Sequence, residues 1–461
     1  MFGMRQMLAA GAASVIMAVA PAAQSETLAD ALIAAYKNSH LLDQNRALLR
    51  AADEDVATSV AALRPVVNFV ASASKQVRSV QQVPTNTIIE NGSLELSAEL
   101  TLYDFGRSAA GIAVAKESVL ATRASLVGVE QQVLLGTVQA YVNVRLAQEI
   151  VELRRNNVRV IGEELKASED RFEVGEVTRT DVALAESALG EARAAMAAAE
   201  GDLLVAREAY RALTGAYPVK LAPLPAAPRL PGSLKEAVAI AMRNHPSMIE
   251  AQHSVKVADL NVELAKANMK PSIGLSTSVG VAATNQSRDY DYAQAGVSMS
   301  QTLYAGGRLS SLLRRAQAQR EAQRSALLNT TVTVEQNVSN AWSSVDVLAA
   351  QIAGNSRQIE AAQVAFEGVR EEAKLGARTT LEVLDAEQDL LNARAARIQS
   401  EAERYYSLYS VLATTGLLTV EKLNLGIPTY DVTAYYNAVK DAPASFQGQQ
   451  LDRVLKALGQ E

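Results

Sequence analysis

Three short stretches of this sequence occur twice, in the same order and at nearly the same distance. The matched pairs are 64–65 with 270–271, 101–107 with 302–308, and Gly175 and Glu186 with Gly376 and Glu387. The offset is 206 residues for the first pair (271 − 65) and 201 for the others (302 − 101 and 376 − 175). A repeat with matched turn residues indicates one supersecondary unit used twice. We therefore expect two copies of that unit rather than unrelated domains.

The 12 prolines are placed very unevenly. None lies between Thr85 and Tyr217, and none lies between Ser272 and Ile427. A proline inside a helix removes a hydrogen bond and clashes with the preceding turn. Two proline-free spans of this length, in a chain with only 5% aromatic residues, favour very long helices.

Residues 1–25 are typical of a secretory signal peptide. Arg5 supplies the positive charge, the stretch from Met7 to Ala20 is apolar and rich in alanine, and small residues follow where cleavage is expected. The alternative, a membrane anchor, fits less well because the apolar stretch is short for a membrane span. The sequence thus predicts export, in a bacterium.

Composition excludes several classes of protein. The chain has no cysteine, so it contains no disulfide, no thiolate metal site and no lipid attached to a cysteine. After the signal there is no run of about eighteen apolar residues, the length that predicts a transmembrane helix. A net charge of −6 and a pI of 5.5 offer no basic surface for nucleic acid.

Each copy opens with a helical segment, expected over 28–63 and again over 234–269. An N-cap hydroxyl precedes each segment, with an acid three residues later as its capping-box partner: Thr27 with Asp30, and Ser233 with Glu236. Both segments should end at a proline, Pro65 or Pro271, because the residue before proline disfavours helical torsion angles.

The period of the sequence then changes from helical to alternating. Apolar and polar residues alternate over 94–102 and over 273–281, which predicts strands. We expect two strands per copy, at about 66–76 and 93–103 and at about 272–282 and 293–304. The predicted connections contain turn-forming residues, Asn91-Gly92 in the first copy and the polar run 285–291 in the second.

A long helix follows the strands in each copy. The intervals from Gly106 to Gly175 and from Gly307 to Gly376 are both 69 residues (175 − 106 and 376 − 307). As continuous helix each would span roughly 100 Å, at 1.5 Å per residue. The second copy has a heptad seam for packing against another helix, formed by Val334, Val338, Ala341, Val345, Leu348, Ile352 and Ile359 with Asn355 in the missing place. A second long helix should return to about Gly215 or Gly416.

The predicted fold is mainly α with a small β part. A first structural repeat (26–225) and a second (226–427) each combine helices with two strands, and a C-terminal equatorial segment or tail (428–461) follows. Four strands cannot close a membrane barrel, since the smallest have eight. Two chains would supply eight strands and three chains twelve. The alternative is a soluble, half-buried β hairpin on a helical stalk.

The motifs resemble those of the TolC family of outer-membrane export channels, over nearly the whole mature chain. The matching stretches are 102–107 with 303–308, 171–175 followed by 180–182, 374–378 leading into 382–387, and 426–431. The resemblance implies a homotrimer, with a 12-strand outer-membrane β-barrel continuous with a 12-helix periplasmic α-barrel. It also implies docking to a periplasmic adaptor (membrane fusion) protein and to an inner-membrane ABC exporter or efflux pump.

The resemblance also implies roles for residues near the two helical turns. Gly175 and Gly376 would mark the tips at the periplasmic entrance, and Gly106 and Gly307 the strand-to-helix junctions. Glu382 and Asp385, three residues apart on one helix face, would form acidic rings that constrict the pore and select cations. Mutual repulsion in such rings should raise some of their pKa values.

A latch is implied as well. Arg378 would tie the tip closed through Thr180 and Asp181 of the first turn. A tyrosine that supports this latch in the family is replaced here by Ala373, so we expect a channel that rests closed with a weaker latch.

No catalytic motif, phosphate-binding loop or cofactor site is predicted. The histidines His40, His245 and His253 have no metal-ligand spacing. The leading hypothesis is an exit duct, a passive channel for type I protein secretion or multidrug efflux, open to either cargo. The alternatives are a secreted structural coiled-coil or adaptor-like protein with a soluble β lid, and a plain porin, in which the long helices would have no purpose.

Overall fold

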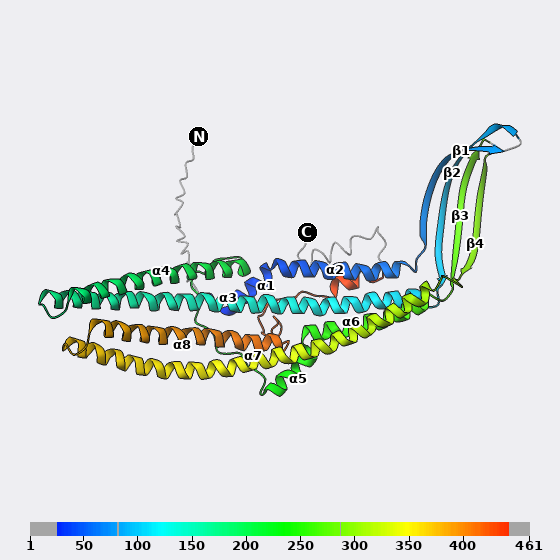
Figure 1. Cartoon of the computed structure of the whole chain (residues 1–461). Helices are drawn as coiled ribbons and strands as arrows, with labels where there is room; N and C mark the ends of the chain where they lie inside the picture. Colours follow the sequence, from blue (N-terminus) through cyan, green and yellow to red (C-terminus); the bar gives the residue numbers. More distant parts are fainter. Residues whose placement is uncertain (1–24, 81–82, 286, 442–461) are drawn as a thin grey trace, which may run out of the picture.

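The computed structural model describes residues 25–80, 83–285 and 287–441. The signal peptide predicted for 1–25 therefore lies almost wholly outside the described residues. The elements come in the order helix, helix, strand, strand, long helix, long helix, and this order is then repeated. Figure 1 shows an elongated molecule with the strands at one end and two helical turns at the other. The fold class predicted from the sequence is confirmed.

The first unit consists of α1 (Leu28–Asn38), α2 (His40–Ala61), β1 (Val66–Val80), β2 (Val83–Tyr103), α3 (Arg107–Glu173) and α4 (Arg179–Thr214). The second consists of α5 (Leu234–Asn244), α6 (Pro246–Ala267), β3 (Ser272–Thr284), β4 (Tyr290–Ser300), α7 (Arg308–Lys374) and α8 (Thr380–Thr414). A short helix, α9 (Ala434–Val439), follows. Both long helices, α3 and α7, contain 67 residues, as their equal spacing predicted.

The two opening helical segments are each split, where the sequence predicted one helix. Ser39 is extended and accepts a hydrogen bond from the Leu42 amide, so it ends α1 and caps α2. In the second unit His245 is extended and Pro246 begins α6. The residue before a proline is pushed out of the helical region, and this break was therefore readable from the sequence. The predicted capping box of Thr27 and Asp30 is present. In the second unit Ser233 accepts the Glu236 amide, but the Glu236 carboxylate accepts the Gly232 amide instead of that of Ser233, so the reciprocal box is not formed.

Two strand boundaries also differ from the prediction. Asn91 and Gly92 lie inside β2, not in a turn, because they pair with Ser74 and Ala73 of β1 and also with Thr284 and Ala283 of β3. Hydrogen bonding on both sides outweighs the turn preference of an isolated Asn-Gly pair. In the second hairpin the strand begins at Tyr290 and ends at Ser300, several residues earlier than expected.

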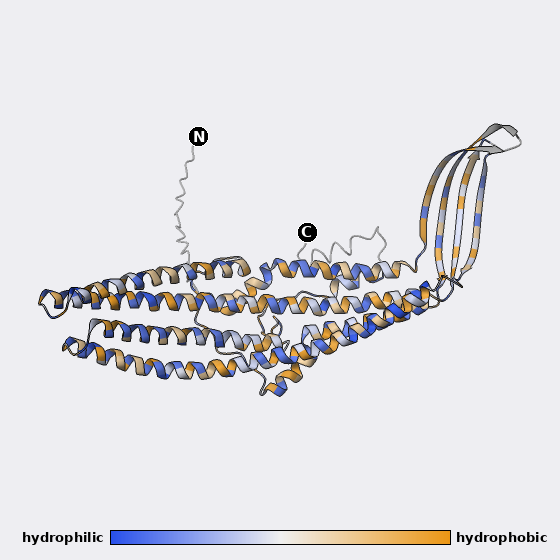
Figure 2. Cartoon of the chain, viewed as in Figure 1, coloured by the Kyte–Doolittle hydropathy of each residue, from blue (hydrophilic) through white to orange (hydrophobic). Residues whose placement is uncertain are grey.

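The four strands form one antiparallel sheet in the order β1-β2-β3-β4. Paired residues share a face, so the register separates the side chains cleanly. One face carries apolar residues: Val67, Phe69, Leu94, Leu96, Leu100, Leu275, Val279, Val281, Val297 and Met299. The other carries mainly small and polar residues, among them Asn68, Ser72, Glu95, Glu99, Ser276, Ser278 and Gln294. Hydrophobic and hydrophilic positions alternate along the strands in Figure 2.

The apolar face is exposed to solvent in the single chain. Phe69 is 68% exposed, Val297 66% and Leu96 48%. At the end of the sheet away from the helices, the apolar face ends at Lys75, which forms an ion pair with Glu90 (2.8 Å), and at Asp291. Within the described residues, no helix is long and apolar enough to cross a membrane.

The main core lies where α1, α2, α4 and α8 pack around the middle of α3. Tyr141 and Tyr210 are fully buried there, and both hydroxyls bind Glu26: Tyr141 through the backbone carbonyl (3.0 Å) and Tyr210 through the carboxylate (2.6 Å). The C-terminal segment contacts α2 and α3, with the Tyr435 hydroxyl donating to Glu54 (2.7 Å) and Arg123 stacked over the Tyr436 ring. Figure 1 shows α9 beside α2.

Candidate functional site at the tips of the helical hairpins

The two helical turns lie together at the end of the molecule far from the sheet (Figure 1). Gly175 and Gly376 follow the ends of α3 and α7 with φ of +81° and +75°. This left-handed conformation is one that residues with a Cβ rarely adopt, which explains a glycine at each turn. We call the segments 174–179 and 375–380 the tips.

A capping box starts the returning helix at each tip. In the first, the Thr178 hydroxyl and amide both donate to Asp181 Oδ2, at 2.7 and 2.9 Å. In the second, the Thr379 hydroxyl and amide donate to Glu382 Oε2, at 3.0 and 2.8 Å. The threonine hydroxyls accept the amides of Asp181 and Glu382 in return. Both acids are thus fixed at the N-termini of helices, where negative charge is favourable.

Arg378 lies between two carboxylates of its own turn. Its Nε donates to Glu372 (2.8 Å) and its Nη1 to Glu382 (2.9 Å). The backbone amide of Thr379 and the Arg378 guanidinium together lower the pKa of Glu382 to about 2. In the single chain this shift is opposite in direction to the one that repulsion within an acidic ring would cause. Glu382 is therefore held as a carboxylate by its own helix cap.

The other predicted site residues lie close by. Asp385 is exposed one turn further along α8, and Thr180 is exposed in the first turn of α4. Hydrogen bonds from Thr178 lower the pKa of Asp181. Because both partners of Arg378 belong to its own turn, its contact with Thr180 and Asp181 stays a prediction. The single chain does not contain the ring of Glu382 and Asp385, which also stays a prediction.

Polar contacts that the sequence did not reveal join the two helical hairpins just behind the tips. Glu164 of α3 is buried and its carboxylate accepts Arg370 Nε of α7 at 2.7 Å. Asn157 of α3 donates to Glu387 of α8 at 3.3 Å. These residues belong to different repeats, so only the tertiary packing of the first helical hairpin on the second, with α3 beside α8, could bring them together.

Ala373 and Glu387 show how the two repeats differ. Ala373 is buried, and its carbonyl accepts Arg171 Nη1 from α3 at 3.1 Å. Glu387 is only 4% exposed, and burial raises the pKa of its carboxyl. Its counterpart in the first repeat, Glu186, is exposed. The duplicated glutamate was visible in the sequence, but its burial in one copy only was not.

The strand-to-helix junctions place Gly106 and Gly307 at the N-caps of α3 and α7, both with positive φ. In the first junction Asp104 takes over the capping, accepting the Ser108 amide at 2.7 Å and the Gly106 amide at 3.2 Å. The second junction has Ala305 in the corresponding position.

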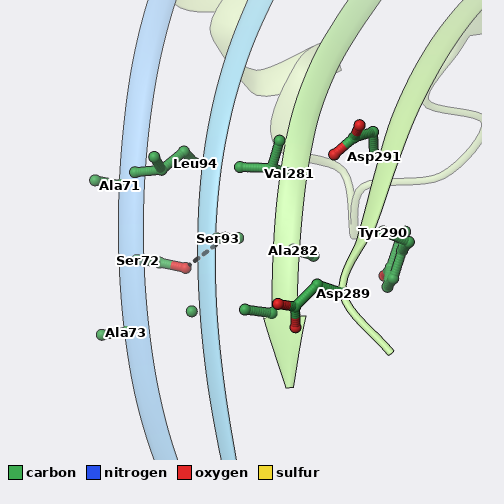
Figure 3. A pocket seen from close by; sticks show the side chains of 12 residues that line it. Ala71, Ser72, Ala73, Ser93, Leu94, Val281, Ala282, Asp289, Tyr290 and Asp291 are labelled. Atoms are coloured by element: carbon green, nitrogen blue, oxygen red, sulfur yellow. Dashed lines mark hydrogen bonds between the residues drawn. The ribbon is translucent and has the colours of Figure 1, made fainter. Parts of the chain in front are cut away.

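A shallow hollow of about 460 Å³ lies on the sheet. Figure 3 shows Leu94 and Val281 on neighbouring strands and the hydrogen bond between Ser72 and Ser93 (2.8 Å). Most of its lining is alanine, serine, glycine and leucine. These side chains fit a curved sheet surface better than a reaction site.

The histidines take separate structural roles. His245 caps α6 by accepting the Ser247 amide, and His253 pairs with Glu117 at 2.7 Å. Among the described residues, no group of three or more His, Asp or Glu side chains is placed to hold a metal ion.

Comparisons with known proteins agree on one family. The family described as "Outer membrane efflux protein" matches residues 32–216 and 238–417. Outer membrane efflux protein BepC of Brucella suis is 35% identical over 424 residues, covering 91% of this chain and 92% of BepC. Outer membrane protein TolC of Vibrio cholerae is 25% identical over 439 residues, covering 92% and 99%. The solved structure of VceC from Vibrio cholerae superposes with a TM-score of 0.72 at 20% identity, covering 84% and 96%.

Proposed function

Because the chain belongs to the outer membrane efflux protein family, we propose that three copies of it pool their sheets into one closed barrel in the outer membrane. Three copies of a four-stranded sheet give 12 strands (3 × 4). The long helices would continue the barrel as a periplasmic tube of 12 helices. The protein is an outer-membrane channel of an export system and extends into the periplasm.

The amphipathic sheet with two unpaired edges is the observation that best supports the proposed barrel. Among the described residues, β1 and β4 each pair with only one neighbouring strand. A free strand edge cannot stand in lipid, because its backbone groups would lack hydrogen-bond partners. The exposed apolar face would contact lipid, and the polar face with Glu95 and Glu99 would line the water-filled channel.

We further propose a passive duct opened by its partners. A periplasmic adaptor protein and an inner-membrane ABC exporter or efflux pump would dock at the tips and supply the energy. The cargo would be protein, as in type I secretion, or small toxic molecules, as in multidrug efflux. A neighbouring gene for an ABC exporter would favour the first cargo, and one for a resistance-type pump the second. In this role the chain carries out no catalysis and needs no cofactor.

The gate of this duct would lie at the tips. Glu382 and Asp385 from three chains would surround the entrance and favour cations. Arg378 would act as the latch, its guanidinium shared between its own Glu372 and Glu382 and the Thr180 and Asp181 of the first turn. Ala373 supports this region through its backbone carbonyl, which accepts Arg171, and through its methyl group, which packs with Val383 and Leu390. It has no hydroxyl, which fits a weaker latch than a tyrosine would provide.

The test uses the purified full-length protein. A heat-resistant trimer in the outer-membrane fraction is expected, and a soluble periplasmic monomer would exclude the channel. In planar bilayers, Arg378→Ala should conduct more than wild type. Arg397→Ala is the matched control. The Arg397 side chain on α8 is as exposed as that of Arg378, and within the described residues its ion pair is with Glu401. If the Arg378→Ala channel conducts no more than wild type, the proposed latch role of Arg378 is wrong.

A further inference from the structure

Next to the sheet, four helices form a layer in the same order as the strands that they adjoin. α2 leads into β1, α3 follows β2, α6 leads into β3 and α7 follows β4. Within the layer α2 packs on α3, α3 on α6, and α6 on α7. Figure 1 shows α2 and α7 on opposite sides of α3. Among the described residues, α2 and α7 are therefore the edges of the layer, as β1 and β4 are the edges of the sheet.

The free side of α2 carries an exposed stripe of residues with heptad spacing. Counted away from the sheet at intervals of four, three, four and three, its residues are Asp55, Ala51, Leu48, Gln44 and Leu41. All five are exposed, Leu48 to 54% and Leu41 to 40%. We call them the α2 stripe. Alternating intervals of four and three are the spacing by which one helix packs along another.

The free side of α7 carries a stripe with the same intervals. Counted away from the sheet, its exposed residues are Arg314, Ala318, Glu321, Ser325 and Leu328. We call them the α7 stripe. Val334 and Val338 of α7 pack with Met248 of α6, and the helical period of 3.6 residues puts them on the opposite side of α7 from this stripe. The α7 stripe is thus unpartnered in the single chain, where Leu328 is 68% exposed.

The two stripes match in level. Asp55 lies six residues before the end of α2 (61 − 55), and Arg314 lies six residues after the start of α7 (314 − 308). α2 runs toward the sheet and α7 runs away from it, so the two stripes would pair antiparallel from this level. The pairs would then be Asp55 with Arg314, Ala51 with Ala318, Leu48 with Glu321, Gln44 with Ser325, and Leu41 with Leu328.

The two stripes also match in chemistry. The pair nearest the sheet combines opposite charges, and the pair farthest from it combines two exposed leucines. Neither Asp55 nor Arg314 belongs to an ion pair within the described part of the chain. Arg315, also exposed, adds a second positive charge at the level of Asp55. Complementary charges beside an apolar stripe determine which partner a helix takes and at what register.

We propose that the α2 stripe packs antiparallel on the α7 stripe of a second copy of this chain, with the Asp55 carboxylate paired to Arg314 of that copy. The two stripes differ, so each copy uses one stripe on each neighbour, and contacts of this head-to-tail kind close into a ring. The inference rests on the proposed trimeric barrel, because pairing of β4 with β1 of the next copy brings α7 beside that copy's α2. The ion pair fixes which level of α2 meets which level of α7.

Charge reversal in the purified full-length protein tests the ion pair. Arg314→Glu should lower the temperature at which the trimer dissociates by roughly 5 °C or more, because like charges then face each other at every contact between copies. Asp55→Lys should do the same, and the double variant, which restores opposite charges, should recover most of the loss. Gel electrophoresis after heating measures the temperature. Lys256→Glu is the matched control, because Lys256 is an exposed cation of α6, between α3 and α7, and should leave the temperature unchanged.

A cysteine pair tests the register independently of charge. The chain has no cysteine, so any disulfide must involve the introduced residues. Oxidation of Leu41→Cys with Leu328→Cys should link neighbouring copies. Leu41→Cys with Ala350→Cys is the control, because Ala350 is also exposed on α7 but lies 22 residues further along the helix (350 − 328). That is roughly 33 Å at 1.5 Å per residue, too far for a disulfide in the proposed register.

An Arg314→Glu trimer as stable as wild type would overturn the proposal, and so would a double variant no more stable than the single ones. Where a charge variant does not assemble, the cysteine pair decides the matter. Absence of the link between Leu41→Cys and Leu328→Cys, or an equal link in the control, contradicts the proposed packing. Failure of the proposed channel would appear differently, as the absence of a membrane-bound wild-type trimer and of conductance.

Discussion

At the scale of single residues, the polar face of the sheet depends on a glycine. Glu95, Gly280 and Tyr292 are paired across β2, β3 and β4, so they share one face. The Tyr292 ring lies over Gly280, and its hydroxyl donates to Glu95 at 2.6 Å. A Cβ at position 280 would lie 2.7 Å from both the Tyr292 ring and the Leu94 carbonyl. The bridge therefore requires a residue without a side chain.

Gly280→Ala should lower stability by about 1–3 kcal/mol, the usual cost of overpacking a well-packed site. The reason is that Tyr292 would have to leave Glu95. The thermal unfolding midpoint of the detergent-solubilised protein measures the effect. Gly296→Ala on β4 is the control, because a Cβ there would meet only Ser276 Oγ at 3.9 Å. Equal midpoints for both variants would contradict this account.

Glu387 gives a prediction for pH. Burial raises the pKa of its carboxyl above the ordinary value of 4.5, so the folded state holds this proton at a pH where the unfolded chain has released it. Its contribution to stability is thus full below pH 4.5 and is lost as the pH rises through the folded-state pKa. Glu387→Gln cannot lose this contribution. Its stability relative to wild type should therefore be higher at pH 7 than at pH 4.

Thermal unfolding of wild type and Glu387→Gln at both pH values is the measurement. Glu186→Gln, the exposed counterpart in the first repeat, should behave like wild type at both. If the difference between wild type and Glu387→Gln is the same at pH 4 and pH 7, the burial of Glu387 does not control its titration.

At the scale of elements, the helical hairpins depend on caps that are local in sequence and on contacts that are not. The capping boxes Thr178–Asp181 and Thr379–Glu382 lie within three residues, and the glycine turns precede them. Such motifs can be recognised from sequence alone. The contact of Glu164 with Arg370 joins α3 to α7, and its partners are more than two hundred residues apart (370 − 164 = 206).

Arg370→Met should destabilise the protein by about 1–3 kcal/mol, because it leaves the buried Glu164 carboxylate without its partner while Arg370 itself is partly solvated. Adding Glu164→Gln should recover much of the loss. Unfolding midpoints of the two single variants and the double variant form the cycle. Arg397→Met, which breaks an exposed pair with Glu401, should cost at most about 0.5 kcal/mol.

If the double variant were destabilised by the sum of the two single effects, Glu164 and Arg370 would make no net contribution as a pair to the contact between the two hairpins. Conductance recorded on the same variants would then show whether the contact also restrains the tips, since it lies directly behind them.

At the scale of the whole molecule, the proposed trimer would close a sheet that the single chain leaves open. In the described residues, the sheet has two free edges and one exposed apolar face. Water can hydrogen-bond to the edges, but it leaves the apolar face unfavourably exposed. The absence of cysteine makes a disulfide test clean. Ser72→Cys on β1 can be combined in turn with Gln294→Cys, Gly296→Cys or Ser298→Cys on β4, all on the polar face.

On oxidation, at least one of these double-cysteine variants should form disulfides between copies. The largest covalent product on a denaturing gel should then be a trimer. Ser72→Cys with Ser276→Cys is the control, because β2 separates β1 from β3 within the sheet and no link between copies is expected. If the largest cross-linked product were a dimer, the barrel would have eight strands instead of twelve.

Much of this protein is determined by its sequence alone. The duplication, the equal long helices, the glycine turns and the capping boxes follow from local rules of backbone conformation, which act over a few residues. The tertiary structure alone decided that Asn91-Gly92 is strand, that Glu387 is buried and Glu186 is not, and that Glu164 meets Arg370. The physical reason is the same in each case. Pairing and burial depend on neighbours from distant parts of the chain, and their energies override the local preference.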